Sequence, residues 1–216
     1  MQKALDKVKK AYSFWGNFPL LYAAQDYFTF MGRPQFIRKR AAEKLHAKKG
    51  GMVLEVACGN GRNFPHIMKA IGKEGRLLGF DYSREMLDYG GKFCMEKGWN
   101  NVKLVQGDAA VLRIGENDFD GVLSVLGISA IPDWGKALKR CHEVLKPGGR
   151  LSVCDARLFR GWLKFLNPFA KSIYSKYAAW DSSKNIPEKM KEIFGNVEVE
   201  DFNVGTMFIA VSTKEK

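Results

Sequence analysis

Short apolar runs alternate with amphipathic stretches after position 52, and this alternation restricts the possible folds more than any other feature. Strands are predicted at Met52–Ala57, Arg76–Phe80, Val102–Gln106, Asp120–Leu126 and Arg150–Asp155. Helices are predicted between them at Asn63–Ile71, Arg84–Lys97 and Trp134–Leu145. Because nearly continuous apolar strands alternate with helices, the pattern predicts an α/β fold with a mostly parallel sheet and helices on both faces.

The two ends of the chain depart from this alternation. Val197–Asn203 and Thr206–Ser212 predict two strands joined by a short turn, so a seven-stranded sheet should close with an antiparallel hairpin. A plain dinucleotide-binding fold would carry another crossover helix instead. Near the N-terminus a helix is expected around Gln35–Lys48, after a less regular aromatic segment. We therefore predict an N-terminal helical cap over residues 1–50 and a main domain over 51–216.

The first predicted strand leads into a glycine-containing turn, Cys58-Gly59-Asn60-Gly61, that opens a helix. Glycine permits a tight turn and lets a ligand approach the backbone, and the N–H groups of the helix face whatever binds. Phe64 takes the third position of the GxGxxG pattern. The pyrophosphate fingerprint of a NAD-binding domain is therefore broken.

Acidic side chains occur at the ends of three successive predicted strands, at Glu55, Asp81 and Asp108. Open α/β sheets bind ligands at the carboxyl ends of their strands. Asp81 follows Gly61 by 20 residues, and a carboxylate in this place can accept hydrogen bonds from both ribose hydroxyls of an adenosyl ligand. The pattern predicts an adenosyl site at this edge of the sheet.

Together these motifs resemble the class I S-adenosylmethionine-dependent methyltransferases over about Met52–Thr213. The run Glu143-Val144-Leu145-Lys146-Pro147-Gly148-Gly149 is a frequent signature of that family, whose seventh strand is also antiparallel. The resemblance implies a Rossmann-like fold, an enzyme and S-adenosylmethionine as cofactor. The cofactor-binding residues that it implies are Glu55, Ala57, Gly59, Asn60, Gly61, Asp81, Tyr82, Met86, Asp108, Ala109 and Leu126.

The resemblance also implies where these residues lie along the cofactor. Three would line the methionine side: Glu55, Gly59 and Gly61. Asp81 would bind the ribose, and Leu126 would lie near the sulfonium. The adenine would contact Tyr82, Met86, Asp108 and Ala109.

Some of these positions have structural alternatives. Asp108 could serve as a helix N-cap, and Tyr82 and Met86 could be ordinary packing residues. Many members of the family carry glycine where this chain has Ala57. We expect the methyl group of Ala57 to be tolerated if the backbone stays extended.

The sequence offers no obvious general base and no metal site. His66 and His142 fall within predicted helices and are expected to be structural, and His46 should lie on the surface. The four cysteines form no CxxC pair, so no metal site is predicted. Methyl transfer from a sulfonium is an in-line displacement, in which positioning and desolvation can supply much of the acceleration. The (Asp/Asn)-Pro-Pro-Tyr motif of many nucleobase methyltransferases is absent after the fourth strand.

Positive charge is concentrated in two aromatic segments. Of the net charge of +12, residues 1–50 contribute +8, from 11 basic and 3 acidic residues. A second segment, Ala156–Trp180, contains five basic residues and no acid. Basic charge among large apolar side chains suits an anionic surface, and a well-solvated enzyme surface is the alternative. We predict a lid over residues 156–185, with an amphipathic helix packed on the domain as the alternative.

The flanking segments resemble enzymes that modify lipids and quinones. The lead-in that contains Tyr12 and Tyr22 is similar to one that closes over the methyl donor in phospholipid N-methyltransferases and in ubiquinone/menaquinone-type enzymes. Arg157–Pro168 resembles an insertion in phosphatidylethanolamine N-methyltransferase-like proteins. The resemblance implies Tyr12 and Tyr22 as catalytic residues, and a carboxylate such as Asp26 could assist.

The favoured acceptor is therefore a phospholipid amine. The alternative is a quinone or another hydrophobic small molecule, methylated at carbon, oxygen or sulfur. Two further classes stay open: an RNA methyltransferase and a non-catalytic adenosyl-binding subunit. The sequence contains no visible RNA-binding module, which argues against nucleic acid as a partner. The oligomeric state stays open.

The expected location is the cytoplasm, with peripheral contact to an anionic membrane as a further expectation. The chain contains no apolar stretch of the roughly 18–20 residues that a membrane-spanning helix needs. The N-terminus has no signal-peptide pattern. Scattered cysteines favour a reducing compartment.

Overall fold

The computed structural model describes residues 19–115, 118–159, 161–168, 171 and 180–215. The regular elements given below for these residues are seven strands and six α-helices. The strands are β1 (Met52–Val56), β2 (Arg76–Asp81), β3 (Val102–Gln106), β4 (Phe119–Val125), β5 (Leu145–Ala156), β6 (Glu198–Phe202) and β7 (Met207–Thr213). The α-helices are α2 (Pro19–Thr29), α3 (Pro34–Glu43), α4 (Phe64–Ile71), α5 (Arg84–Glu96), α6 (Trp134–Val144) and α8 (Ile186–Phe194).

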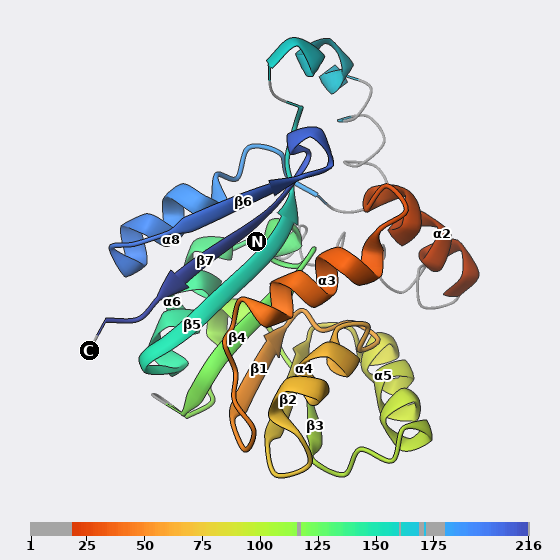
Figure 1. The fold of residues 1–216 in the computed structure, drawn as a ribbon, viewed down its shortest axis with the longest axis vertical. Coiled ribbons are helices and arrows are strands. Elements are labelled where there is room, and N and C mark those ends of the chain that lie inside the picture. The colour runs from red at the N-terminus through yellow and green to blue at the C-terminus, as the bar shows by residue number, and fades with distance from the viewer. Residues whose placement is uncertain (1–18, 116–117, 160, 169–170, 172–179, 216) are drawn as a thin grey trace.

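The strands form one sheet in the order β3-β2-β1-β4-β5-β7-β6 (Figure 1). Neighbouring strands from β3 to β5 are parallel, and β7 runs antiparallel to both β5 and β6. The predicted fold class, a mostly parallel Rossmann-like sheet that closes with an antiparallel hairpin, is confirmed. β5 begins at Leu145, five residues before the predicted start. Leu145 pairs with Phe119, and a shift in register follows before Arg150 pairs with Gly121.

Helices cover both faces of the sheet. On one face, α3, α4 and α5 pack against the sheet, and on the other face α6 and α8 do so (Figure 1). In α4 the buried residues are Phe64, Ile67, Met68 and Ile71, the spacing of an amphipathic helix. The sheet is therefore buried on both faces, as its apolar strands require.

Three helices differ from the sequence-based expectation. The aromatic segment that was expected to be less regular contains α2, and α8 was not predicted. α3 ends at Glu43 because the chain turns there: His46 has a φ of 52°, and Leu45 packs beneath β4. Gly121 of β4 leaves the space for this contact, since a Cβ at that position would lie 3.3 Å from a methyl group of Leu45.

The second half of the predicted cap belongs to the core of the sheet. Phe30, Ile37, Ala41 and Leu45 are buried in the same cluster as the residues of β1 and α4. α3 therefore packs against β4 and β5, and α2 packs against α3.

The lid is described only in part. The short helix η3 (Gly161–Leu166) projects beyond the end of β5 (Figure 1), and it has no buried residue. Trp162 is 81% exposed and Phe165 is 67% exposed. The described part of the lid thus differs from the packed amphipathic helix that was the alternative. None of the helices in the described ranges is long and apolar enough to cross a bilayer.

Candidate functional site

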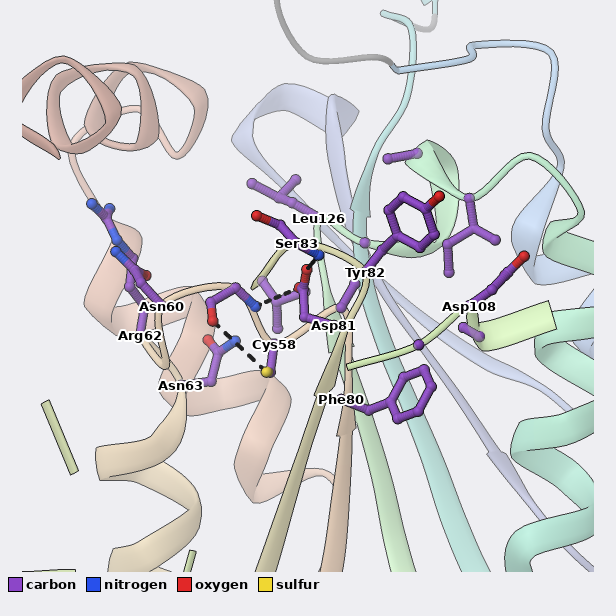
Figure 2. Close-up of a pocket in the computed structure, with 18 of the residues that line it drawn as sticks. Cys58, Asn60, Arg62, Asn63, Phe80, Asp81, Tyr82, Ser83, Asp108 and Leu126 are labelled. Atoms are coloured by element: carbon purple, nitrogen blue, oxygen red, sulfur yellow. Dashed lines mark hydrogen bonds between the residues drawn. The ribbon is translucent and has the colours of Figure 1, made fainter. Parts of the chain in front are cut away.

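A cleft opens at the carboxyl ends of β1, β2 and β4, where the sequence predicts an adenosyl site. Eight of the eleven predicted cofactor residues line it (Figure 2): Ala57, Gly59, Asn60, Asp81, Tyr82, Asp108, Ala109 and Leu126. Other lining residues are Arg38, Cys58, Arg62, Asn63, Phe80, Ser83, Gly107, Val125, Gly127, Ala130, Ile131 and Pro132. The tight turns after the strands bring these side chains together, which the position of the motifs at the strand ends predicts.

Two non-glycine residues that line the cleft have left-handed backbone conformations. Ala57 and Leu126, at the ends of β1 and β4, each have a φ of 55°. The backbone at Ala57 is therefore not extended, which was the condition for tolerating its methyl group: the chain turns sharply there to enter the glycine loop. Gly127 makes this turn possible, because a Cβ at that position would lie 2.6 Å from the Cβ of Ala57.

The Asp81 carboxylate joins the glycine loop to the end of β2. Its Oδ2 accepts a hydrogen bond of 2.7 Å from the Gly59 N–H, and its Oδ1 accepts one of 2.8 Å from the Ser83 N–H (Figure 2). Burial raises the pKa of Asp81, and these N–H groups oppose the rise. A carboxylate has about four acceptor positions, so both oxygens retain capacity for ribose hydroxyls.

Glu55 does not line the cleft as expected, because the glycine loop and Asn63 cover it. It is fully buried, and its Oε1 accepts a hydrogen bond of 2.5 Å from the Asn63 amide. Its Oε2 has no partner among the described residues. Burial raises the pKa of Glu55 to about 8, so the carboxyl is protonated at neutral pH. Glu55 therefore does not line the cleft itself, but it accepts a hydrogen bond from Asn63, which does.

Gly61 and Met86 also lie outside the lining of the cleft. Gly61 has a φ of 82°, and a Cβ there would lie 2.5 Å from the ring of Phe64. Met86 is buried, and its N–H donates to the Oγ of Ser83, the N-cap of α5. These two residues shape the loop and the helix behind the site.

Asp108 lines the cleft and is also a helix N-cap, the structural alternative that the sequence offers. Its side chain lines the cleft, and its Oδ1 accepts a hydrogen bond of 2.9 Å from the Ala110 N–H. That bond makes Asp108 the N-cap of the short helix η1 (Ala109–Val111).

A buried series of ion pairs and hydrogen bonds, which the sequence does not predict, runs from α2 to β1. Arg38 Nη2 lies 2.5 Å from Asp26 Oδ1, and Arg62 Nη1 lies 2.7 Å from Asp26 Oδ2. Arg38 Nη1 also donates to Asn63 Oδ1 at 2.9 Å, and Asn63 in turn donates to Glu55. Arg38 is 3% exposed although α3 is basic, and this burial is invisible in the sequence.

These linked polar side chains determine the charge at one end of the cleft. Two guanidinium groups share the single carboxylate of Asp26, so positive charge is in excess within this ion-pair cluster. A cationic end of this kind suits the carboxylate of an amino acid. The sequence suggests Asp26 as an assisting carboxylate. In the structure both of its oxygens form ion pairs with arginines, Arg38 and Arg62.

The cleft fits S-adenosylmethionine by the chemistry of its lining. The cationic end with Arg38 and Arg62 suits the methionine carboxylate, and Asp81 offers acceptors to the ribose. Tyr82 and Ala109 add apolar surface to the wall of the cleft. A Cβ at Gly59 would meet nothing within 4 Å, so the backbone is open to a ligand there.

The predicted catalytic tyrosines cannot be placed in this cleft. Tyr12 lies outside the described residues, as does the side chain of Tyr22. All three histidines are described, and none of them lines the cleft. Among the described residues no group of three side chains could hold a metal ion.

Comparison with known proteins places the chain in a family. The model of the ubiE/COQ5 methyltransferase family matches residues 27–203. A demethylmenaquinone methyltransferase of Staphylococcus carnosus (strain TM300) is 34% identical over 201 residues, which covers 83% of this chain and 82% of the relative. A demethylmenaquinone methyltransferase of Staphylococcus aureus (strain JH9) is 33% identical over 200 residues, with 83% and 82% covered.

Solved structures share the fold at lower identity. A SAM-dependent methyltransferase from Aquifex aeolicus superposes with a TM-score of 0.64 at 18% identity, covering 87% of this chain and 92% of that chain. Phosphoethanolamine N-methyltransferase 2 of Haemonchus contortus, solved with S-adenosyl-L-methionine, gives a TM-score of 0.68 at 19% identity and covers 84% and 53%. The chain is an S-adenosylmethionine-dependent class I methyltransferase and belongs to the ubiE/COQ5 methyltransferase family.

Proposed function

We propose that the protein transfers a methyl group from S-adenosylmethionine to a quinone-class acceptor. One observation carries this proposal: the demethylmenaquinone methyltransferases are 33–34% identical to this chain over about four fifths of both lengths. The sequence favoured a phospholipid amine and held the quinone as the alternative. The phosphoethanolamine enzyme shares 19% identity with this chain, and this similarity supports a common fold alone.

The lining of the cleft supports a flat apolar acceptor. Past Leu126 the wall consists of Ala130, Ile131 and Pro132, which follow β4. Among the described lining residues the only cationic side chains are Arg38 and Arg62, next to the glycine loop. A phosphate-bearing headgroup would need cations beside the reacting amine. An aromatic ring needs only an apolar surface and access to the methyl group.

The residues of the chain then have defined tasks. Bound S-adenosylmethionine supplies the electrophilic methyl group. Arg38 and Arg62 hold its carboxylate, Asp81 holds the ribose, and the turn at Leu126 borders the sulfonium. Tyr12 and Tyr22 stay proposed as residues that close over the methyl donor.

We also propose that the lid contacts an anionic membrane, where quinones with hydrocarbon tails reside. Trp162 and Phe165 are exposed on η3, and Lys164 lies between them in sequence. Exposed aromatic groups beside a cation suit the interface of an anionic bilayer.

Methyl transfer with radiolabelled S-adenosylmethionine tests the acceptor. Three acceptors are compared under one condition: a reduced demethylated naphthoquinone, phosphatidylethanolamine and total RNA. We expect label in the naphthoquinone alone, and a strong decrease for the variant Asp81→Asn. Label in phosphatidylethanolamine or RNA, with none in the quinone, would refute the proposal and leave the cofactor site standing.

A further inference from the structure

A second cavity lies further along the same edge of the sheet, at the end of β5 and the start of β7. It is lined by Thr29, Met31, Ala156, Arg157, Phe159, Trp180, Thr206 and Met207. None of these residues lines the cofactor cleft. The walls come from the end of α2, the end of β5, both roots of the lid and the terminal hairpin, so only the folded chain forms this cavity.

The polar groups of these walls form hydrogen bonds within the wall and with neighbouring residues of the protein. Trp180 Nε1 donates to the Ala156 carbonyl at 3.2 Å, and the Arg157 N–H donates to the Thr206 carbonyl at 2.8 Å. The Arg157 guanidinium pairs with Asp201 and donates to the Gly205 carbonyl. The side chains of Met31, Phe159, Trp180 and Met207 are left to offer their apolar surface.

The buried Asp155–Ser129 pair connects the strand end that leads into this cavity with the segment that leads into the wall of the cofactor cleft. Asp155 precedes Ala156, and its Oδ2 accepts a hydrogen bond of 2.9 Å from the Ser129 N–H. Its Oδ1 accepts one of 2.7 Å from the Ser129 hydroxyl. Ser129 adjoins Ala130, which lines the cofactor cleft. Neighbours of this hydrogen-bonded pair therefore line both cavities: Ala156 lines the second cavity, and Ala130 lines the cofactor cleft.

We propose that this second cavity binds the hydrocarbon tail of the acceptor while the ring of the acceptor enters the cofactor cleft. The inference rests on the proposed function. Burial of apolar groups away from water is favourable, so an apolar chain is the ligand that gains most from such walls. An anion gains little, because Asp201 already neutralises Arg157. Met31 is 49% exposed at the rim, where a longer tail can leave the cavity.

Binding of geraniol, a ten-carbon isoprenoid alcohol, tests this inference without requiring turnover. Calorimetry on the full chain measures its affinity for the parent, for Ala156→Leu and for Ala24→Leu. Ala156→Leu fills the cavity, and Ala24→Leu adds the same atoms at an exposed position of α2. We expect saturable binding to the parent, at least tenfold weaker binding to Ala156→Leu and no change for Ala24→Leu. The affinity for S-adenosylmethionine should stay within twofold throughout.

Three results would overturn the inference: no saturable binding by the parent, equal binding by Ala156→Leu, or competition between geraniol and S-adenosylmethionine. If Ala156→Leu also loses cofactor binding, geraniol binding is measured for Phe159→Ala instead, because this variant removes part of the cavity wall without adding atoms. Weaker geraniol binding with unchanged cofactor affinity is then the expected result. The two proposals can fail separately. Geraniol binding that Ala156→Leu abolishes, with no label in the quinone, would refute only the proposed function. Label in the quinone without geraniol binding would refute only the tail site.

Discussion

The buried ion pair between Arg38 and Asp26 predicts a strong energetic coupling between α3 and α2. Arg38→Met keeps the length of the side chain and removes the ion pair of 2.5 Å and the hydrogen bond to Asn63. Removing one partner of a buried pair costs about 3–5 kcal/mol. Arg62 still contacts Asp26 at 2.7 Å, so we expect the lower end, about 3 kcal/mol.

A double-mutant cycle separates this coupling from other losses. Asp26→Asn should cost about 3 kcal/mol for the same reason, because it leaves Arg38 and Arg62 without their carboxylate. The double variant should be less destabilised than the sum of the two single variants, with a coupling of about 1–3 kcal/mol. Urea unfolding at pH 7 measures the free energies, provided the slope of the transition is unchanged. Arg38→Met should also weaken S-adenosylmethionine binding at least tenfold.

A surface pair provides the matched control. Arg84 and Asp88 lie 3.0 Å apart on α5, and their side chains are 69% and 53% exposed. Pairs of this kind contribute about 0.3–0.5 kcal/mol. A coupling between Arg38 and Asp26 no larger than that of this control would refute the assignment of a buried, structurally required pair.

Four further outcomes follow from the structure. Because the folded chain holds the Glu55 proton up to a pKa of about 8 and the unfolded chain releases it near 4.5, the free energy of unfolding should fall as pH rises through this interval. Glu55→Gln should remove this fall, which is on the order of 5 kcal/mol, in denaturation series at pH 5 and pH 8.5. Ala57→Gly should raise the unfolding free energy by about 1 kcal/mol, since glycine adopts a φ of 55° without strain; a lower denaturation midpoint would contradict this. Asp81→Ala should weaken S-adenosylmethionine binding at least tenfold in calorimetry, and unchanged affinity would exclude its ribose contact. The protein should float with anionic liposomes, and high salt should release it. Replacing Trp162 and Phe165 by serine should reduce flotation. Equal recovery with neutral liposomes would argue against the membrane contact.

Local patterns in the sequence determined the sheet and the edge at which the cofactor cleft lies. Apolar runs marked the central strands, because a strand buried on both faces must be apolar throughout, whereas the edge strands β3 and β6 are more polar and more exposed. The glycine turn and Asp81 marked the cleft, because the ends of parallel strands meet at one edge. Asp81, Tyr82, Asp108 and Leu126 line the cleft for this reason.

The tertiary structure alone decided which polar groups became partners and which cavities formed. Arg38 and Asp26 belong to different helices, and no periodicity indicates that an arginine of a basic helix is buried against a carboxylate. The lining of the second cavity spans Thr29 to Met207, so its apolar character depends on distant segments that pack together. The left-handed turn at Ala57 has the same origin, since packing against Gly127 selects a conformation that alanine alone disfavours. Local sequence thus determined the elements, and long-range packing decided the charge and shape of the sites between them.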